Sequence, residues 1–333
     1  MLRVRPYHLI EVVSALGCDR EARRNPFIRT LMGAIRKDPD RPLMLVCNAE
    51  KVWTYQDPGR GLDTPESPEF HQKRDLEILY RLNLFPGAIL PARILFHRLW
   101  DQIENLEGLC VFSSETAPAW TGWPRTRVAA YRRGWQRGVA VLLRPRPVGE
   151  LRREKHLSVA VVERSGVVAV RPHILLCSVC QYGAGVRPPY PEDNLPELIQ
   201  RMLRDPTLQL RQVPHADWMM CAPCPYRHTA LNACVNNKGS GGLPNQLRDL
   251  RVLQILGLTY GALHLARALY RQLLERVPGT RAICRIEHGR PSVWWTGCGA
   301  LPKDNPNYRR GRKALLKQLD RADKALEKTA LPR

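Results

Sequence analysis

Apolar side chains recur at roughly helical spacing between residues 248 and 258, where Leu250, Leu253 and Leu256 fall on one face and predict a helix. Shorter apolar stretches predict four strands, at residues 2–4, 43–46, 167–170 and 208–213. A proline marks the end of two further helices, at Asp38-Pro39 and Asp205-Pro206. Together these patterns predict an α+β fold that is mostly helical, with short strands.

The same succession of patterns occurs twice along the chain. Residues 73–95 and 247–269 align without a gap, and 11 of their 23 positions are identical. Residues 2–10 match residues 168–176 in the same way, and Tyr-Arg-Arg-Gly occurs at 131–134 and again at 308–311. Because the matches keep their order over such a long period, they predict two tandem related domains and not an array of short repeats.

The matches also set the expected domain boundaries. We expect an N-terminal copy at 1–140, a basic junction at 141–166, a C-terminal copy at 167–302 and a basic amphipathic extension at 303–333. Within the junction, the apolar residues 158–162 are followed by a Ser-Gly turn and by the strand at 167–170, which predicts a hairpin.

Cysteines are distributed unequally between the two copies. The first copy contains only Cys18, Cys47 and Cys110, whereas the second contains Cys177, Cys180, Cys221, Cys224, Cys234, Cys284 and Cys298. The densest group is a Cys-x-x-Cys pair, Cys221 and Cys224, followed by Cys234. Two thiolates on one tight turn can reach the same metal ion or cluster, so this spacing indicates a metal centre.

The predicted ligands of this centre are Cys177, Cys221, Cys224 and Cys234, with Cys180, Cys284 and Cys298 as possible further ligands. Pro225 directly after Cys224, and the scarcity of histidine at ligand spacing, favour an iron–sulfur cluster. Zinc stays an alternative, because Cys-x-x-Cys turns bind both kinds of metal.

The first copy provides an internal comparison. Glu11, Thr54 and Asp57 occupy the positions of Cys177, Cys221 and Cys224. Such polar replacements are not expected for small core residues, whereas the loss of one metal site explains all three. Cys284 instead aligns with Cys110, which is typical of a cysteine that serves as a small buried apolar residue.

Several motifs of the second copy occur in a recognisable order. They are Arg171-Pro172-His173-Ile174-Leu175-Leu176-Cys177, the segment Cys221 to Pro225, Cys234, Arg248-Asp249, Leu256-Gly257-Leu258, and finally Cys284, Trp294-Trp295 and Cys298. In these motifs the chain resembles the bacterial and archaeal family catalogued as domain of unknown function 1284. The resemblance implies iron–sulfur binding but no particular reaction. The paired histidine of the family is split here, since the second copy keeps His173 and the first keeps His8.

The segment that carries the first of these motifs also supplies polar neighbours for the metal. We expect Arg171 and His173 to lie beside the ligands and to tune the charge there. The sequence identifies no catalytic residue.

The composition narrows the class of protein. Apolar residues make up 44% of the 333 residues, which is typical of a folded chain. The sequence has no apolar run of membrane-spanning length and no secretory signal at its N-terminus, so we expect a cytoplasmic protein without a membrane partner. In that compartment cysteines are expected to be thiols or metal ligands.

The net charge of +21 is concentrated in two segments. Residues 113–160 carry ten Lys and Arg against three acidic residues, and residues 303–333 carry ten against four. In the second segment Leu315, Leu319, Ala322 and Leu326 form an apolar stripe that predicts an amphipathic helix. Such surfaces suit nucleic acid or an acidic partner protein, but a solvated helix that packs by its stripe is favoured.

Three functional hypotheses follow. The first is an iron–sulfur protein with a redox or sensing role, which implies a redox partner protein. The second is a zinc-stapled module that binds nucleic acid or an acidic partner. The third is an enzyme that acts at a cluster with an open coordination site.

Overall fold

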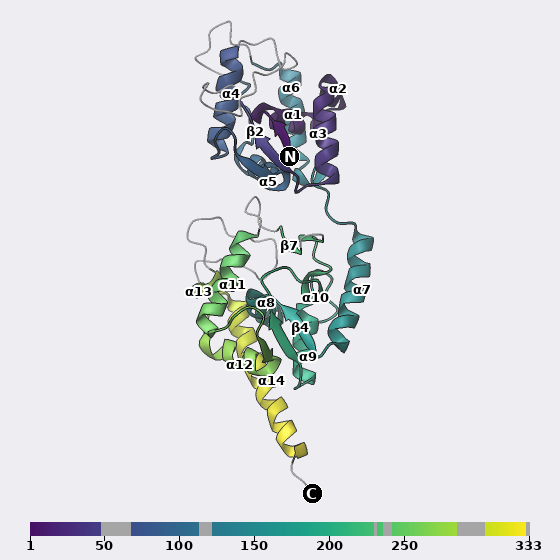
Figure 1. Cartoon of the computed structure of the whole chain (residues 1–333), viewed down its shortest axis with the longest axis vertical. Coiled ribbons are helices and arrows are strands. Elements are labelled where there is room, and N and C mark those ends of the chain that lie inside the picture. The colour runs from purple at the N-terminus through teal and green to yellow at the C-terminus, as the bar shows by residue number, and fades with distance from the viewer. Residues whose placement is uncertain (48–67, 113–121, 230–231, 236–241, 285–303, 331–333) are drawn as a thin grey trace. The chain divides into compact units, whose positions relative to one another are not determined.

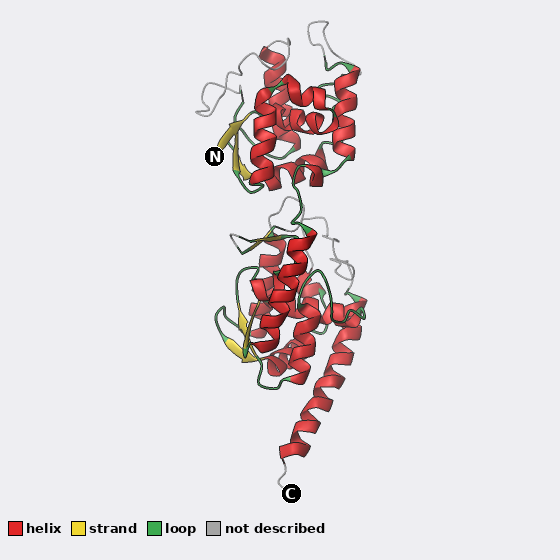
Figure 2. Ribbon diagram, turned by 90° about the vertical axis from the view of Figure 1, so that its right-hand side faces the viewer, coloured by secondary structure: helices red, strands yellow, loops and turns green. Residues whose placement is uncertain are grey.

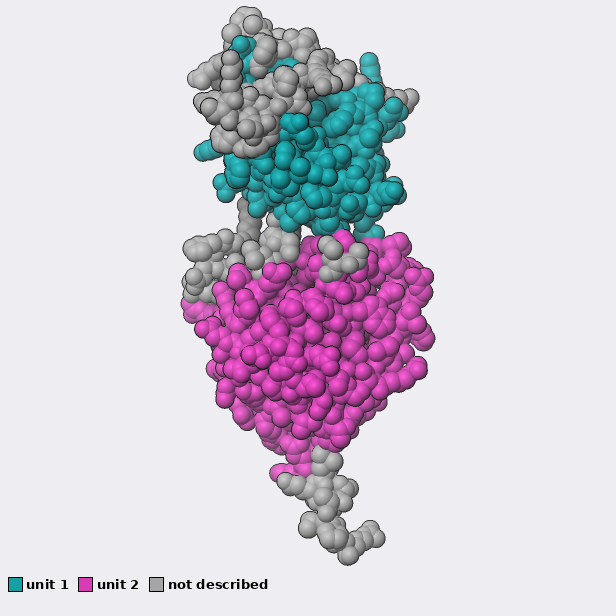
Figure 3. Space-filling view, viewed as in Figure 1, with its two compact units in different colours: residues 1–145 teal, residues 146–333 magenta. Residues whose placement is uncertain are grey.

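The computed structural model describes residues 1–47, 68–112, 122–229, 232–235, 242–284 and 304–330. Helices dominate and the strands form small sheets, which confirms the α+β, mostly helical class (Figure 2). The contacts divide the chain into two compact units, unit 1 (Met1–Pro145) and unit 2 (Arg146–Arg333), which Figure 3 colours separately. None of the described helices is both long and apolar enough to cross a membrane.

Unit 1 begins with a strand and three helices and ends with a short 3-10 helix (Figure 1). Its elements in chain order are β1 (Leu2–Val4), α1 (Pro6–Gly17), α2 (Asp19–Arg24), α3 (Pro26–Lys37), β2 (Pro42–Leu45), α4 (Pro68–Arg81), β3 (Ile89–Pro91), α5 (Ala92–Gln102), α6 (Arg125–Gln136) and η1 (Val139–Val141).

Unit 2 adds a long helix in front of its first strand and a two-stranded ribbon in its middle (Figure 1). Its elements are α7 (Val148–Arg164), β4 (Val167–Val170), α8 (Pro172–Gly183), α9 (Leu195–Arg204), β5 (Gln209–Gln212), α10 (Trp218–Cys221), β6 (Arg227–His228), β7 (Ala233–Cys234), α11 (Leu243–Leu256), β8 (Leu263–Leu265), α12 (Ala266–Arg276), α13 (Arg281–Cys284) and α14 (Pro306–Ala330).

Each unit contains a three-stranded sheet of the same topology. In unit 1, β2 lies between β1 and β3, parallel to the first and antiparallel to the second. In unit 2, β5 lies between β4 and β8 with the same directions. Buried strand residues such as Val4, Leu45, Val170 and Leu210 face the helices, so each sheet closes one side of its own core (Figure 2).

The first helix of each unit starts at a proline that follows an arginine. Arg5 and Arg171 have extended backbone, with φ and ψ of −77° and 146° and of −73° and 143°. This is the conformation expected before proline. Proline itself suits the first helical turn, where its missing N–H has no acceptor to satisfy. The strand therefore ends and the helix begins at the same motif in both units.

This first helix packs against a later helix at glycines. In unit 2, a Cβ on Gly183 of α8 would lie 1.9 Å from the carbonyl oxygen of Asn307, and one on Gly311 of α14 would lie 2.0 Å from that of Val179. Only glycine allows two helix backbones to approach this closely. Gly17 and Gly134 make the same contact between α1 and α6 in unit 1.

The tyrosine of each Tyr-Arg-Arg-Gly motif supports the same packing. The Tyr131 hydroxyl donates to the carbonyl of Ile103 at 2.6 Å, and the Tyr308 hydroxyl donates to the carbonyl of Val277 at 2.7 Å. Both rings are buried. The repeated motif thus provides a buried anchor and a glycine for helix contact.

The hairpin predicted at the junction is wrong. Residues 158–162 lie within α7, which leads directly into β4. The run of β-branched residues resembles a strand in sequence, but Ser158 and Val162 are one helical turn apart and are both buried. Burial of one face of α7 against the rest of unit 2 therefore outweighs the local preference for a strand.

The segment 303–333 is not an appendage beyond the second copy. It forms α14, and its residues Tyr308, Leu315 and Leu319 belong to the core of unit 2. The apolar stripe is therefore the packing face of the helix, as the favoured interpretation of the sequence has it.

Gly183→Ala tests the close helix contact in unit 2. We expect it to lower the free energy of unfolding by about 2 kcal/mol or more, because the added methyl group overlaps the α14 backbone. Gly149→Ala on α7 is the matched control, since nothing lies within 4 Å of the position that its new Cβ would take. Denaturant unfolding followed by circular dichroism measures both, and equal stability of the two variants would contradict the contact.

Candidate metal centre

The Cys-x-x-Cys pair lies on a tight turn that follows a single turn of helix. Asp217 caps α10, its carboxylate accepting from the backbone N–H of Met219 at 2.8 Å. The backbone N–H of Cys224 then donates to the carbonyl of Cys221 at 3.0 Å. The turn carries both sulfurs out of one short segment, which is the arrangement that the spacing predicts.

A short ribbon brings the third cysteine back to this turn. Strand β6 pairs antiparallel with β7, so that Cys234 lies opposite Arg227, three residues after Cys224. The backbone N–H of Arg227 donates to the carbonyl of Cys224 at 3.2 Å and joins the ribbon to the turn. Cys221, Cys224 and Cys234, called the three-cysteine site below, therefore come from one compact segment.

The thiols of the three-cysteine site are close enough to affect one another's ionisation. Burial raises the pKa of Cys221 well above its ordinary value, and the charges of Cys224 and Cys234 raise it further. Burial also raises the pKa of Cys224 to about 12; the backbone N–H of Tyr226 lowers it and the charge of Cys234 raises it. Thiols that oppose each other's ionisation in this way are the groups whose charge a bound cation offsets.

A cation lies beside these thiols. Arg171 is buried and pairs with Asp249, at 2.8 Å from Nε and 2.5 Å from Nη2 to the same carboxylate oxygen. Burial alone would lower the pKa of Arg171, but the charges of Asp249, Cys234 and Cys221 give a net rise. Arg171 thus lies within electrostatic reach of two cysteines of the site.

His173 faces the aspartate. Its Nδ1 lies 2.6 Å from Oδ1 of Asp249, and its backbone N–H donates to the same oxygen at 3.0 Å. Burial lowers the pKa of His173, although Asp249 opposes the shift. His173 therefore completes the partners of the aspartate, and through Asp249 it acts on the orientation of Arg171.

The start of α11 lies against the third cysteine. A Cβ on Gly242, which has a φ of +79°, would lie 2.2 Å from the carbonyl oxygen of Cys234. The amide nitrogen of Asn245 donates to the Cys234 sulfur at 3.4 Å. Both the helix N-terminus and the amide favour a negatively charged sulfur.

Arg146 holds the turn from the other side. Its Nη1 donates to the carbonyls of Ala222 and Cys224, at 2.7 and 3.0 Å, while Glu150 accepts from the same guanidinium at 2.7 Å. Sequence reasoning missed Arg146 and Asn245, because neither belongs to a motif. It gave Asp249 no role, although an Arg and an Asp at matching positions of both copies were a usable signal.

Three of the remaining predicted ligands influence buried tyrosines of unit 2. Cys177, on α8, is half-buried against the core, and it adds to the burial that raises the pKa of Tyr270. Burial raises the pKa of Tyr308, and the charges of Cys180 and Cys284 raise it further. Cys298 lies outside the described residues.

The internal comparison extends to Cys284. Its counterpart Cys110 is buried in the core of unit 1, where it adds to the burial that raises the pKa of Tyr131. Tyr131 and Tyr308 are the equivalent tyrosines of the repeated motif. Each of these two cysteines therefore lies near the buried tyrosine of its own unit, which is what a shared packing role predicts.

Unit 1 has charged residues where unit 2 has thiols. Glu11, at the position of Cys177, is buried and lies 2.5 Å from Nη2 of Arg127. Arg127 also pairs with Glu21 at 3.0 Å and stacks 3.8 Å from the centre of the Trp123 ring. Thr54 and Asp57, the other replacements, lie outside the described residues.

Within the described ranges, no three His, Cys, Asp or Glu side chains come together closely enough to hold a metal ion. The chemistry of the three-cysteine site is nevertheless that of thiolate ligands, since it combines three sulfurs with two hydrogen-bond donors and a nearby cation. Comparison with protein-family models, curated sequences and solved structures finds no match for this chain.

Asp249→Asn tests the buried pair beside the site. We expect it to lower the free energy of unfolding by about 3–5 kcal/mol, because it leaves the Arg171 charge buried without a counter-charge. The pKa of Asp249 is lowered: burial raises it, but His173 and Arg171 outweigh burial. The stabilising charge is therefore present above the ordinary aspartate pKa and is lost as the pH falls through the lowered one.

Asp75→Asn in unit 1 is the matched comparison. Burial raises the pKa of Asp75 despite its pairing with Arg5, so unit 1 stabilises the charge of Asp75 less than unit 2 stabilises that of Asp249. Denaturant unfolding at neutral pH should show a smaller loss for this variant than for Asp249→Asn. The reverse order would show that His173 and Arg171 do not stabilise the Asp249 charge.

Proposed function

We propose that unit 2 holds an iron–sulfur cluster at Cys221, Cys224 and Cys234 and that the protein has a redox or oxidant-sensing role. The observation that carries this proposal is the convergence of the Cys-x-x-Cys turn and the ribbon cysteine beside Arg171. All three cysteines are partly exposed, which suits a group that exchanges electrons with a partner protein.

The first choice for a fourth ligand is Cys177. It lies on α8, the helix that starts directly after Arg171, and Arg171 is the residue that reaches the cysteines. Cys298 is the alternative from the end of the copy. Cys284 is disfavoured because it lies beside Tyr308 just as its counterpart, the core residue Cys110, lies beside the equivalent Tyr131 in unit 1.

A cluster bound here would supply one-electron transfer, and the chain would set its potential. Arg171 and the Asn245 amide would stabilise the more negative, reduced state, as would the backbone N–H of Tyr226. Arg146 would hold the turn in place through the two carbonyls that it binds.

Zinc is the second candidate, and one observation favours it. A Cys-x-x-Cys turn followed by a two-stranded ribbon with a further cysteine is also the frame of zinc ribbons. In that case the metal would staple the ribbon to the turn, and the function would lie elsewhere on the surface.

Metal analysis of the anaerobically purified full-length protein separates these candidates. We expect a brown protein that contains iron and acid-labile sulfide. Cys221→Ser, Cys224→Ser and Cys234→Ser should each lose most of the iron, because each removes one thiolate ligand. Colourless protein with one zinc per chain would establish the second candidate in place of the first.

The controls use cysteines outside the proposed site. Cys18→Ser in unit 1 should keep the full iron content, since Cys18 lies between α1 and α2 and far from the motif in sequence. Cys177→Ser should lose iron and Cys284→Ser should retain it. Full iron content in all three variants of the three-cysteine site would exclude it as the ligand set.

A further inference from the structure

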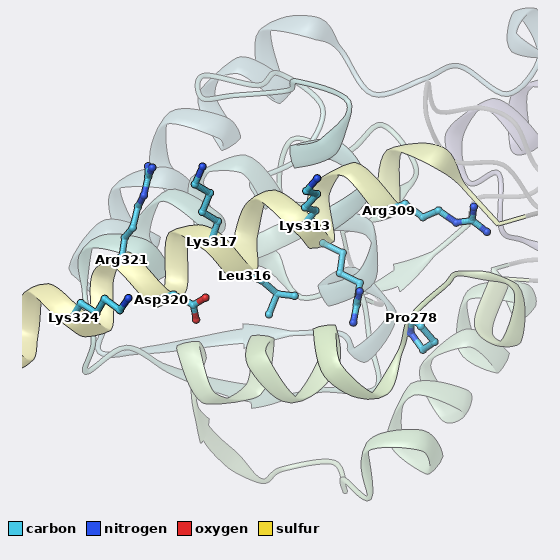
Figure 4. Close-up of a pocket in the computed structure, with 9 residues that line it drawn as sticks. Pro278, Arg309, Lys313, Leu316, Lys317, Asp320, Arg321 and Lys324 are labelled. Atoms are coloured by element: carbon cyan, nitrogen blue, oxygen red, sulfur yellow. The ribbon is translucent and has the colours of Figure 1, made fainter.

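Helix α14 has two chemically different faces. Tyr308, Leu315 and Leu319 are buried in the core of unit 2. The opposite side is exposed and basic, and it borders an open groove of about 800 Å³ next to Pro278 (Figure 4). The cations that line this groove are Arg309, Arg312, Lys313, Lys317, Arg321 and Lys324.

The acidic residues near the groove are already engaged. Asp320, which lines the groove, lies 2.9 Å from Arg271 of α12, and Asp323 lies 2.6 Å from the same guanidinium. Asp304 pairs with Arg309 at 3.1 Å. In the part of the chain that the structure describes, no carboxylate forms an ion pair with Lys313, Lys317, Arg321 or Lys324, which together are called the basic row below.

The basic row is regular. Lys313, Lys317 and Arg321 follow one another at intervals of four residues, and Figure 4 shows their side chains projecting to the same side of α14. Four residues of helix advance about 6 Å, so the charges form a line along the helix. Regularly spaced cations without acidic partners match an anionic polymer better than a single small anion.

The row is specific to unit 2. The equivalent helix of unit 1, α6, ends at Gln136, and it has Trp135 and Gln136 where α14 has Arg312 and Lys313. The fold that the units share is therefore complete without the row. Its charges are not explained by packing, because the four side chains are exposed.

The side chains that line the groove indicate which kind of anionic polymer it suits. Among the described residues, those that line the groove include no aromatic side chain on which unpaired bases would stack, and stacking is the usual means of holding single strands. Of the described residues that line the groove, only Leu316 and Pro278 are apolar, whereas protein partners are anchored mainly by buried aromatic and apolar contacts. We propose that the basic row binds the phosphate backbone of a nucleic acid duplex without reading its sequence.

The test measures binding of the full-length protein to a fluorescent 20-base-pair DNA duplex and to the RNA duplex of the same sequence, over a range of salt concentrations. We expect binding that weakens steeply with salt. Neutralising the basic row (Lys313→Gln, Lys317→Gln, Arg321→Gln and Lys324→Gln together) should weaken binding about tenfold or more near 0.1 M salt. The slope of log K against log salt should fall by about 3 to 4. The duplex that binds more tightly shows whether DNA or RNA supplies the phosphate backbone.

A matched variant separates the row from net charge. It removes four exposed arginines elsewhere, Arg29, Arg132, Arg153 and Arg164. This variant should bind within about twofold of the parent, and thermal unfolding should show both variants folded. The proposal would be overturned by equal losses in the two variants, or by the absence of duplex binding by the parent at about 0.05 M salt. Tighter binding of poly-glutamate than of either duplex would also overturn it, in favour of an acidic protein partner.

Discussion

A buried arginine–aspartate pair fixes the point in each unit where the first strand passes into the first helix. Arg5 pairs with Asp75 and Arg171 with Asp249, and all four residues are buried. Each aspartate also accepts the backbone N–H of the second helical residue, at 3.0 Å in both units. Because burying either ion alone costs several kcal/mol, the two helices joined by the pair must meet here for either charge to be tolerated. The rest of each unit is built around that junction.

The same constraint determines what the junction can do chemically. In unit 2 it holds Arg171 within electrostatic reach of Cys221 and Cys234, so a charge required by the fold also faces the thiols. In unit 1 the neighbouring position is taken by Glu11, which binds Arg127. The same arrangement of strand, helix and ion pair therefore lies beside a buried ion pair in unit 1 and beside thiols in unit 2. At the position of Cys177, unit 1 thus has a carboxylate whose charge Arg127 balances.

The sequence predicts those features that depend on neighbours along the chain. Pro39 and Pro206 marked the ends of α3 and α9, and the spacing of Leu315 and Leu319 indicated the buried face of α14. The junction hairpin failed because Ser158 and Val162 satisfy a helical period as well as a strand preference, and only the packing of α7 decides between them.

Of the candidate site, the turn and its return cysteine were visible in the spacing, whereas the groups that surround them were not. Arg146 reaches the turn from more than 70 residues away, and Asn245 reaches Cys234 from the start of another helix. Contacts of this kind leave no periodic trace in a sequence, since a single side chain makes each of them. The repeated Arg and Asp were the exception, because duplication displays a long-range pair twice.

The cations beside the three-cysteine site and those of the basic row differ in how far they are paired with carboxylates and carbonyls. Arg171 is held by Asp249, and Arg146 by Glu150 and two carbonyls, so these cations are fixed by the fold and shielded from salt. Lys317 and Arg321 are exposed and project from α14, where Asp320 and Asp323 both pair with Arg271. Dissolved salt therefore competes only with the second region. The cations beside the three-cysteine site are therefore held in place by the fold, those of the basic row are open to solvent, and the two regions share no residue.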